Sequence, residues 1–421
     1  MRQVSAVVTC GDTEFGRFGP VEMPTPWWND VAPVVTWLNG LLGVPVAVLR
    51  LVDVEGGKFM RDGHVTYHAE ALANPPANVE AWEHHSIDAK PSSDPSVHLA
   101  VRESIPLGER FVAGDEPLRA SWATVEGLRA ALDWALAITG PSEVRQVKTW
   151  NLAGLFHLPG ANAWLKTTPP FAASESSIIS ALAAVDPTLV PQVLGADPAH
   201  GWMLLAHIPG EDCWKAAPEL VTSTVHRFAR AQQKMITGIP ARTPQLGQAG
   251  AVERAPTTDA SLHDLADRRR ILAAAERLAP VPGSDDLLTQ VPALEEELAA
   301  CGLPYTLVHG DFHPGNWRAV PGGPAVVLDF ADAHFGHPAT DGLRLQEWVG
   351  TADAWIDAWS LPGADPRRAL EVAAPLAALT QAVRYQEFLD NIEPSEQRYH
   401  RGDPEEALEN AVTAFRRLRP A

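Results

Sequence analysis

The run LVHGDFHPGNW at residues 307–317 carries the polar pattern that decides the fold. Within it, His309, Asp311 and Asn316 follow the order His-x-Asp-x-x-x-x-Asn. The glycines and the proline of the run interrupt regular structure, so we predict a loop after a short strand at 306–308. A loop this short brings the Asp311 carboxylate and the Asn316 amide to the same side of a pocket.

A second carboxylate follows at the end of the apolar run 325–328, where Asp329 is predicted to end a buried strand. The spacing from His309 to Asn316 is that of a kinase catalytic loop. In such a loop Asp311 faces an acceptor hydroxyl, and the side-chain oxygen of Asn316 faces a magnesium ion. Mg²⁺ prefers few carboxylates together with phosphate oxygens, which suits Asp329, Asn316 and a nucleotide.

Three segments together resemble the aminoglycoside phosphotransferase and choline kinase superfamily: 309–316, VLDF at 327–330 and GHPATD at 336–341. The resemblance implies an α+β, bilobal protein-kinase-like fold, with a small mixed-sheet amino-terminal lobe and a mainly helical carboxy-terminal lobe. It also implies ATP or GTP as donor, Mg²⁺ as cofactor and a small-molecule hydroxyl as acceptor. The acceptor classes that fit are an aminoglycoside or other antibiotic, a sugar, a nucleoside and an amino alcohol.

The resemblance also implies roles for single residues of the catalytic segment. Asp311 corresponds to the catalytic base, and Asn316 and Asp329 correspond to the magnesium ligands. Asp341 corresponds to a structural acid at the start of the next helix. His309 is expected to brace the loop, and His313 is expected to make local hydrogen bonds.

The amino-terminal lobe offers an independent set of nucleotide-binding candidates. Lys166 lies in the strand-like run 163–167 and would hold the α- and β-phosphates, while Glu175 on the next helix would fix that lysine. The apolar run that begins at Trp202 resembles a hinge between lobes, so the backbone groups of Ala206 and Ile208 would meet the adenine edge. The sequence contains no Gly-x-x-x-x-Gly-Lys motif, which is the other common phosphate-binding loop.

The chain divides into three predicted parts. Residues 1–140 form an extra small α/β unit that could cap the active site or dimerise, residues 141–210 form the amino-terminal lobe, and residues 211–421 form the helical carboxy-terminal lobe. The predicted strands are 5–9, 46–54, 65–69, 144–150, 152–158, 163–167, 202–208, 306–308 and 325–328. The predicted helices are 26–42, 124–138, 174–184, 218–236, 268–279, 292–300 and much of 367–418. An exposed loop is expected at 75–95.

Composition limits the partners. The 421 residues carry a formal net charge of −19, which disfavours nucleic acid and leaves room for a cationic acceptor. No uninterrupted apolar run suits a bilayer or a signal core, and three scattered cysteines suit a reducing cytoplasm. A homodimer is compatible with the sequence. Acids that could line the acceptor cleft are Asp332, Glu347, Asp353, Glu387 and Asp390.

Two other classes of protein remain open from the sequence. One is a catalytically inactive nucleotide-binding protein that acts through a partner. The other is a metal-dependent hydrolase built on His309 and His313, whose spacing of four residues would suit zinc on a helix. The loop-forming glycines and the lack of an evident third ligand argue against zinc. No Ala-Pro-Glu segment follows Asp329, which argues against a protein acceptor.

Overall fold

The computed structural model describes the chain except for residues 12, 75–115, 173–174, 237–273 and 420–421. The described chain forms two compact units. The first comprises 1–169, 199–204 and 388–401, and the second comprises 170–198, 205–387 and 402–421. Residues 141–210 are divided between these units, and the three-part division expected from the sequence remains a prediction.

The first unit begins with a four-stranded sheet in the order β2-β1-β4-β3. Strands β1 (Gln3–Cys10) and β4 (His64–Ala71) pair in parallel, while β2 (Thr13–Glu22) and β3 (Val46–Glu55) pair antiparallel at the two edges. Helix α1 (Ala32–Leu42) packs its buried Val34, Leu38 and Leu42 into the core of this sheet. Every second residue of β1 and β4 lies in this core, as the two-residue repeat of a strand requires: Val4, Ala6, Val8, Val65, Tyr67, Ala69 and Ala71.

The second sheet of this unit follows helix α2 (Val125–Thr139), which begins after its N-cap, Thr124. Strands β5 (Arg145–Trp150), β6 (Ala153–Leu158) and β7 (Ala163–Thr167) run antiparallel, and β9 (Trp202–Ala206) lies beside β7. Buried apolar side chains of α2 pack on this sheet. The predicted three-strand run is therefore present, and Asn162 makes its turn with a left-handed φ of 50°.

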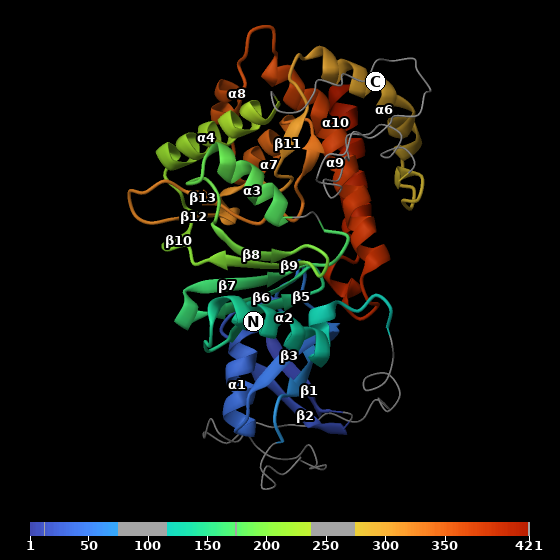
Figure 1. Cartoon of the computed structure of the whole chain (residues 1–421). Helices are drawn as coiled ribbons and strands as arrows, with labels where there is room; N and C mark the ends of the chain where they lie inside the picture. The colour runs from blue at the N-terminus through green and yellow to red at the C-terminus, as the bar shows by residue number, and fades with distance from the viewer. Residues whose placement is uncertain (12, 75–115, 173–174, 237–273, 420–421) are drawn as a thin grey trace. The chain divides into compact units, whose positions relative to one another are not determined.

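The second unit is mainly helical (Figure 1). Its elements, in chain order, are α3 (Glu175–Val185), β8 (Val193–Asp197), β10 (Glu211–Asp212), α4 (Pro218–Ile236), α6 (Ser284–Ala300), β11 (Thr306–Val308), β12 (Trp317–Ala319), β13 (Val326–Val327), β14 (His334–Gly336), α7 (Ala339–Val349), α8 (Asp353–Ala358), most of α9 (Pro366–Asn391) and α10 (Asp403–Leu418). Two small sheets, β10-β12-β13 and β11-β14, carry the loops between these helices. The predicted α+β class is confirmed.

Some predicted elements differ from the structure. The helix expected from residue 26 begins at Ala32, because the backbone of Trp28 donates to the Met60 carbonyl and Trp27 forms a bridge with Arg61. Strands β2 and β8 were not predicted, and α6 begins eight residues before the expected start at Pro292, which lies inside it. The start of α1 depends on distant partners that a local pattern does not contain.

Other predictions lie outside the described residues. They are the loop at 75–95 and the first half of the helix at 268–279. Where the chain is described, no helix combines the length and apolar character needed to cross a bilayer.

Candidate active site

Strand β11 leads directly into the loop that carries the predicted catalytic residues. Gly310 adopts a φ of +82°, and a Cβ at this position would lie 2.3 Å from the Asp332 carbonyl oxygen, so only glycine fits. After it, the side chain of His313 caps a short 3₁₀ turn at Pro314–Asn316 by accepting from the Gly315 amide. The turn brings Asn316 back toward the start of the loop.

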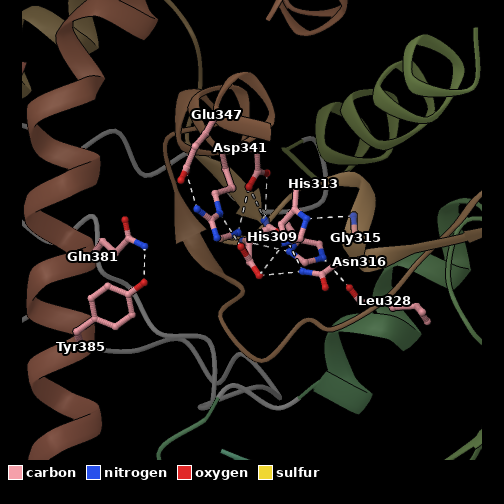
Figure 2. Close-up of polar contacts among 12 residues, drawn as sticks. His309, His313, Gly315, Asn316, Leu328, Asp341, Glu347, Gln381 and Tyr385 are labelled. Carbon is pink, nitrogen blue, oxygen red and sulfur yellow. Dashed lines mark hydrogen bonds and ion pairs between the residues drawn. The ribbon is translucent and has the colours of Figure 1, made fainter. Parts of the chain in front are cut away.

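Buried hydrogen bonds hold the start of the loop. Asp341, on the first turn of α7, accepts from the amide of His309 (Figure 2). It also accepts from the Gly310 amide and from Gln232 Nε2. Burial raises the pKa of Asp341 to about 7, against the hydrogen bonds from these amides and from Gln232. Asp341, expected as a structural acid at the start of the helix after the loop, lies there and holds the loop backbone.

His309 links the loop to the segment that precedes Asp329. The Asp311 amide donates to His309 Nδ1 at 3.2 Å, so Nε2 carries the proton and donates to the Leu328 carbonyl at 2.9 Å. Burial lowers the pKa of His309, which keeps the ring neutral. Both ring nitrogens are engaged within the protein, as expected for a structural histidine.

The Asp311 carboxylate accepts hydrogen bonds from three side chains. Arg344 Nε lies 2.6 Å from Oδ1, while Asn316 Nδ2 and His313 Nε2 lie 2.9 Å and 3.3 Å from Oδ2. Burial would raise the pKa of Asp311, but the hydrogen bond from His313 and the positive charge of Arg344 outweigh it and hold the pKa below its usual value. The side chain is 30% exposed, so a small acceptor can reach an ionised carboxylate.

Asn316 and Asp329 lie on adjoining backbone segments. The Leu328 amide donates to the Asn316 carbonyl at 2.8 Å, directly before Asp329. Asn316 Nδ2 donates to the carbonyl and the carboxylate of Asp311, so the side-chain oxygen of Asn316 is the atom left to face a cation. Asp329 has a φ of 63°, which is uncommon for a residue with a side chain and is typical of functional sites.

These donors fit a divalent cation of the kind expected from the sequence. One carboxylate and one amide oxygen leave most of the coordination sphere to phosphate oxygens and water, which is the arrangement that Mg²⁺ favours. The amide of Phe330, next to Asp329, donates to Glu175 Oε2 at 3.1 Å, which anchors this turn to α3. Glu175 is buried, so its contact with the turn is shielded from water.

The remaining predicted nucleotide residues lie in different parts of the chain. Lys166 is on β7, opposite Leu155 of β6, and belongs to the first unit, whereas Glu175 belongs to the second. In the predicted hinge, the Ala206 amide donates to the Gln192 carbonyl at 2.9 Å. The Ala206 amide is therefore engaged within the protein, and the Ala206 carbonyl is the backbone group that could accept from an adenine amino group. Ile208, the other predicted hinge residue, follows two positions later.

Sequence reasoning missed Arg344, which contacts the central carboxylate. Arg344 comes one helical turn after Asp341 on α7, and residues three apart share a helix face. This spacing is a signal that could have identified it, because Asp341 was already expected beside the loop.

Arginines also pair with several acids that were expected to bind a cationic acceptor. Arg384 pairs with Asp332 at 3.1 Å and with Glu387 at 2.5 Å, and Arg344 pairs with Glu347 at 2.5 Å. At least three of the five candidate acids are therefore already engaged within the protein. Of the other two, Asp353 begins α8, and Asp390 belongs to the first unit.

An aromatic cluster lies beside the loop, formed by Trp214, His313 and Trp348. The ring of Trp348 stacks on His313 with centroids 4.9 Å apart, and Trp214 lies 5.2 Å from His313 and 5.1 Å from Trp348. A Cβ on Gly315 would overlap the Trp214 ring, so this glycine lets the ring lie on the loop backbone. Both tryptophans are about half exposed, which places an apolar surface next to the residue that contacts Asp311.

Comparisons with known proteins identify a family. The model of the phosphotransferase enzyme family (APH) matches residues 163–376. A search of curated proteins finds no match.

Among solved structures, a choline/ethanolamine kinase family protein from Mesorhizobium loti is 17% identical, with 69% of this chain and 99% of that chain covered at a TM-score of 0.46. The choline kinase LicA from Streptococcus pneumoniae is 13% identical, with 68% and 99% covered at 0.48. The GDP complex of aminoglycoside 2'-phosphotransferase-IIIa is 13% identical, with the same coverage and TM-score as LicA.

Proposed function

Because the chain belongs to the phosphotransferase enzyme family, we propose that it transfers the γ-phosphoryl group of ATP or GTP to a hydroxyl of a small molecule. The family match confirms the resemblance and the kinase-like fold expected from residues 309–316. The proposal is carried by one observation: the ionised Asp311 carboxylate and the Asn316 amide are hydrogen-bonded in one loop, next to the turn that holds Asp329.

In this proposal Asp311 accepts a hydrogen bond from the acceptor hydroxyl and orients its oxygen toward the γ-phosphorus. The new O–P bond forms as the bond between the γ-phosphorus and the β–γ bridging oxygen breaks, the nucleoside diphosphate leaves, and the hydroxyl proton passes to the carboxylate. A carboxylate with a lowered pKa is a weak base, so Asp311 contributes chiefly by alignment, and the proton moves late.

Asn316 and Asp329 would hold Mg²⁺, which, when bound, neutralises charge on the phosphate oxygens. Lys166 would contact the phosphates, with Glu175 supporting it, and the backbone of Ala206 and Ile208 would bind the base. The buried hydrogen bond from Phe330 to Glu175 supports a role for Glu175 in fixing the turn that carries Asp329.

The acceptor is proposed to lie against the aromatic cluster. The exposed faces of Trp214 and Trp348 suit the apolar face of a ring, while the neighbouring Asp311 meets its hydroxyl. Since Arg344 and Arg384 already neutralise several nearby acids, a ring contact accounts for acceptor binding without requiring a strongly cationic compound.

The test is a screen of hydroxyl compounds with ATP or GTP and Mg²⁺, read by the mass gain of one phosphoryl group on the acceptor. The panel contains kanamycin, adenosine and choline for the antibiotic, nucleoside and amino-alcohol classes, and glucose and glucosamine for the sugars. We expect phosphorylation of at least one ring-bearing compound and none with Asp311→Ala. Nucleotide binding without consumption, over this panel and wider ones, would favour the inactive nucleotide-binding alternative.

A further inference from the structure

Arg344 is held in place by three neighbours. Its Nε lies 2.6 Å from Asp311 Oδ1, and its Nη1 lies 2.5 Å from Glu347 Oε2. The guanidinium carbon lies 5.3 Å from the centroid of the Trp348 ring, within range of a cation–π contact. Figure 2 shows Glu347 at the upper left, away from His313 and Asn316 of the catalytic loop.

The environment keeps Arg344 charged. Its side chain is 20% exposed, and burial would lower its pKa, but the charges of Asp311 and Glu347 raise it above the usual value. A planar guanidinium can donate to two carboxylates from a fixed orientation, which a lysine ammonium cannot reproduce. Two of the three neighbours that hold the Arg344 cation, Glu347 and Trp348, therefore lie outside the catalytic loop.

Among the described residues, the hydrogen bonds to Asp311 leave one acceptor position open. A carboxylate offers about four lone-pair positions, two on each oxygen. His313 and Asn316 donate to Oδ2, and Arg344 donates to Oδ1. The remaining position lies on Oδ1, the oxygen that Arg344 holds.

We propose that Arg344 is a positioning residue for phosphoryl transfer, which fixes the plane of the Asp311 carboxylate so that Oδ1 receives the acceptor hydroxyl. The inference rests on the proposed function. The acceptor hydroxyl and Arg344 then share one oxygen, and the reaction begins with the arginine in place. An arginine that instead blocked Asp311 would have to leave before reaction, and its removal would speed turnover.

The experiment compares Arg344→Ala and Arg344→Lys with the wild-type chain. Its first measurement does not depend on any acceptor: the carboxyl carbons of aspartate are labelled with ¹³C, and the Asp311 resonance is assigned by its loss in Asp311→Asn. We expect this carboxyl to titrate at higher pH in Arg344→Ala than in the wild type, and guanidinium ion added to Arg344→Ala to reverse the change. An unchanged titration in Arg344→Ala would overturn the proposal.

The second measurement uses an acceptor found in the screen. We expect kcat to fall about 10²-fold in Arg344→Ala, as for a misplaced catalytic group, with the nucleotide KM unchanged. Added guanidinium should raise the kcat of Arg344→Ala at least about tenfold, whereas urea should leave it unchanged. The kcat of Arg344→Lys should remain below that of the wild type. A kcat equal to or above that of the wild type in Arg344→Ala would overturn the positioning role.

The matched control is Arg368→Ala. Arg368 also pairs with two glutamates, Glu297 at 3.1 Å and Glu371 at 2.7 Å, and it belongs to the same unit. Its replacement should leave kcat unchanged and insensitive to guanidinium. If the wild type phosphorylates no compound, the proposed function fails, while the Asp311 titration still decides whether Arg344 controls this carboxylate.

Discussion

Replacing Asp311 with asparagine tests the proposed centre most directly, because the side chain keeps its shape and loses its charge. If the new amide nitrogen takes the place of Oδ1, it faces Arg344 Nε, and no oxygen remains for the acceptor hydroxyl. If it takes the place of Oδ2, it faces the donors of Asn316 and His313. In either orientation the new amide nitrogen, which is a donor, faces another donor at a position where the carboxylate accepts.

The expected cost follows from these two orientations. The second orientation keeps an oxygen toward the acceptor, so some alignment survives in Asp311→Asn and none in Asp311→Ala. General base catalysis contributes about 10²- to 10⁴-fold, so we expect kcat to fall by about 10² for asparagine and toward 10⁴ for alanine. These losses correspond to about 2.7 and 5.4 kcal/mol of activation free energy.

The assay is steady-state turnover with an acceptor from the screen, together with calorimetric binding of nucleotide in the presence of Mg²⁺. Nucleotide affinity should be unchanged in both variants, because the proposed nucleotide and metal contacts come from other residues. Asp186→Asn is the control, since Asp186 also accepts from an arginine, Arg227, at 3.0 Å in the same unit. Turnover of Asp311→Asn within about threefold of the wild type would refute the role of this carboxylate.

Three further outcomes are expected. Asp329→Asn should weaken nucleotide binding at least about tenfold with Mg²⁺ and little with EDTA, by calorimetry; equal loss in both conditions would argue against a metal ligand. Trp214→Ala should raise the acceptor KM about tenfold and leave the nucleotide KM unchanged, and an unchanged acceptor KM would remove the aromatic surface from the site. Burial raises the pKa of Glu396 from 4.5 to about 8. Between these two pH values the folded chain holds a proton that the unfolded chain has lost. The contribution of Glu396 to stability is therefore full below pH 4.5 and is lost as pH rises from 4.5 through 8. Glu396→Gln keeps an oxygen for the Leu51 amide and should be more stable than the wild type at pH 8 by at least about 1 kcal/mol in denaturant unfolding, whereas parallel pH profiles of the two chains would contradict this.

Local pattern predicted much of the helical and strand structure. Helix α4 has the predicted bounds, Pro218 to Ile236, because its apolar residues recur at the helical period and its proline suits the first turn. The three strands β5 to β7 were predicted for a similar reason, since short apolar runs separated by turn residues are typical of antiparallel hairpins. Strand β2 was missed because its residues, TEFGRFGPVE, contain two glycines and a proline and depend on pairing with β1.

By itself, the sequence determined which residues share the catalytic loop, since Asp311 and Asn316 lie five positions apart around turn residues. It also placed Asp329 after a short strand, which in the structure ends two residues earlier, at Val327. Only the tertiary structure decided which groups surround the Asp311 carboxylate. Arg344 reaches it from α7, and that contact depends on how the helix packs against the loop. Spacing along the chain controls local geometry, whereas the partner of a charged group is chosen by packing between segments that no local pattern connects.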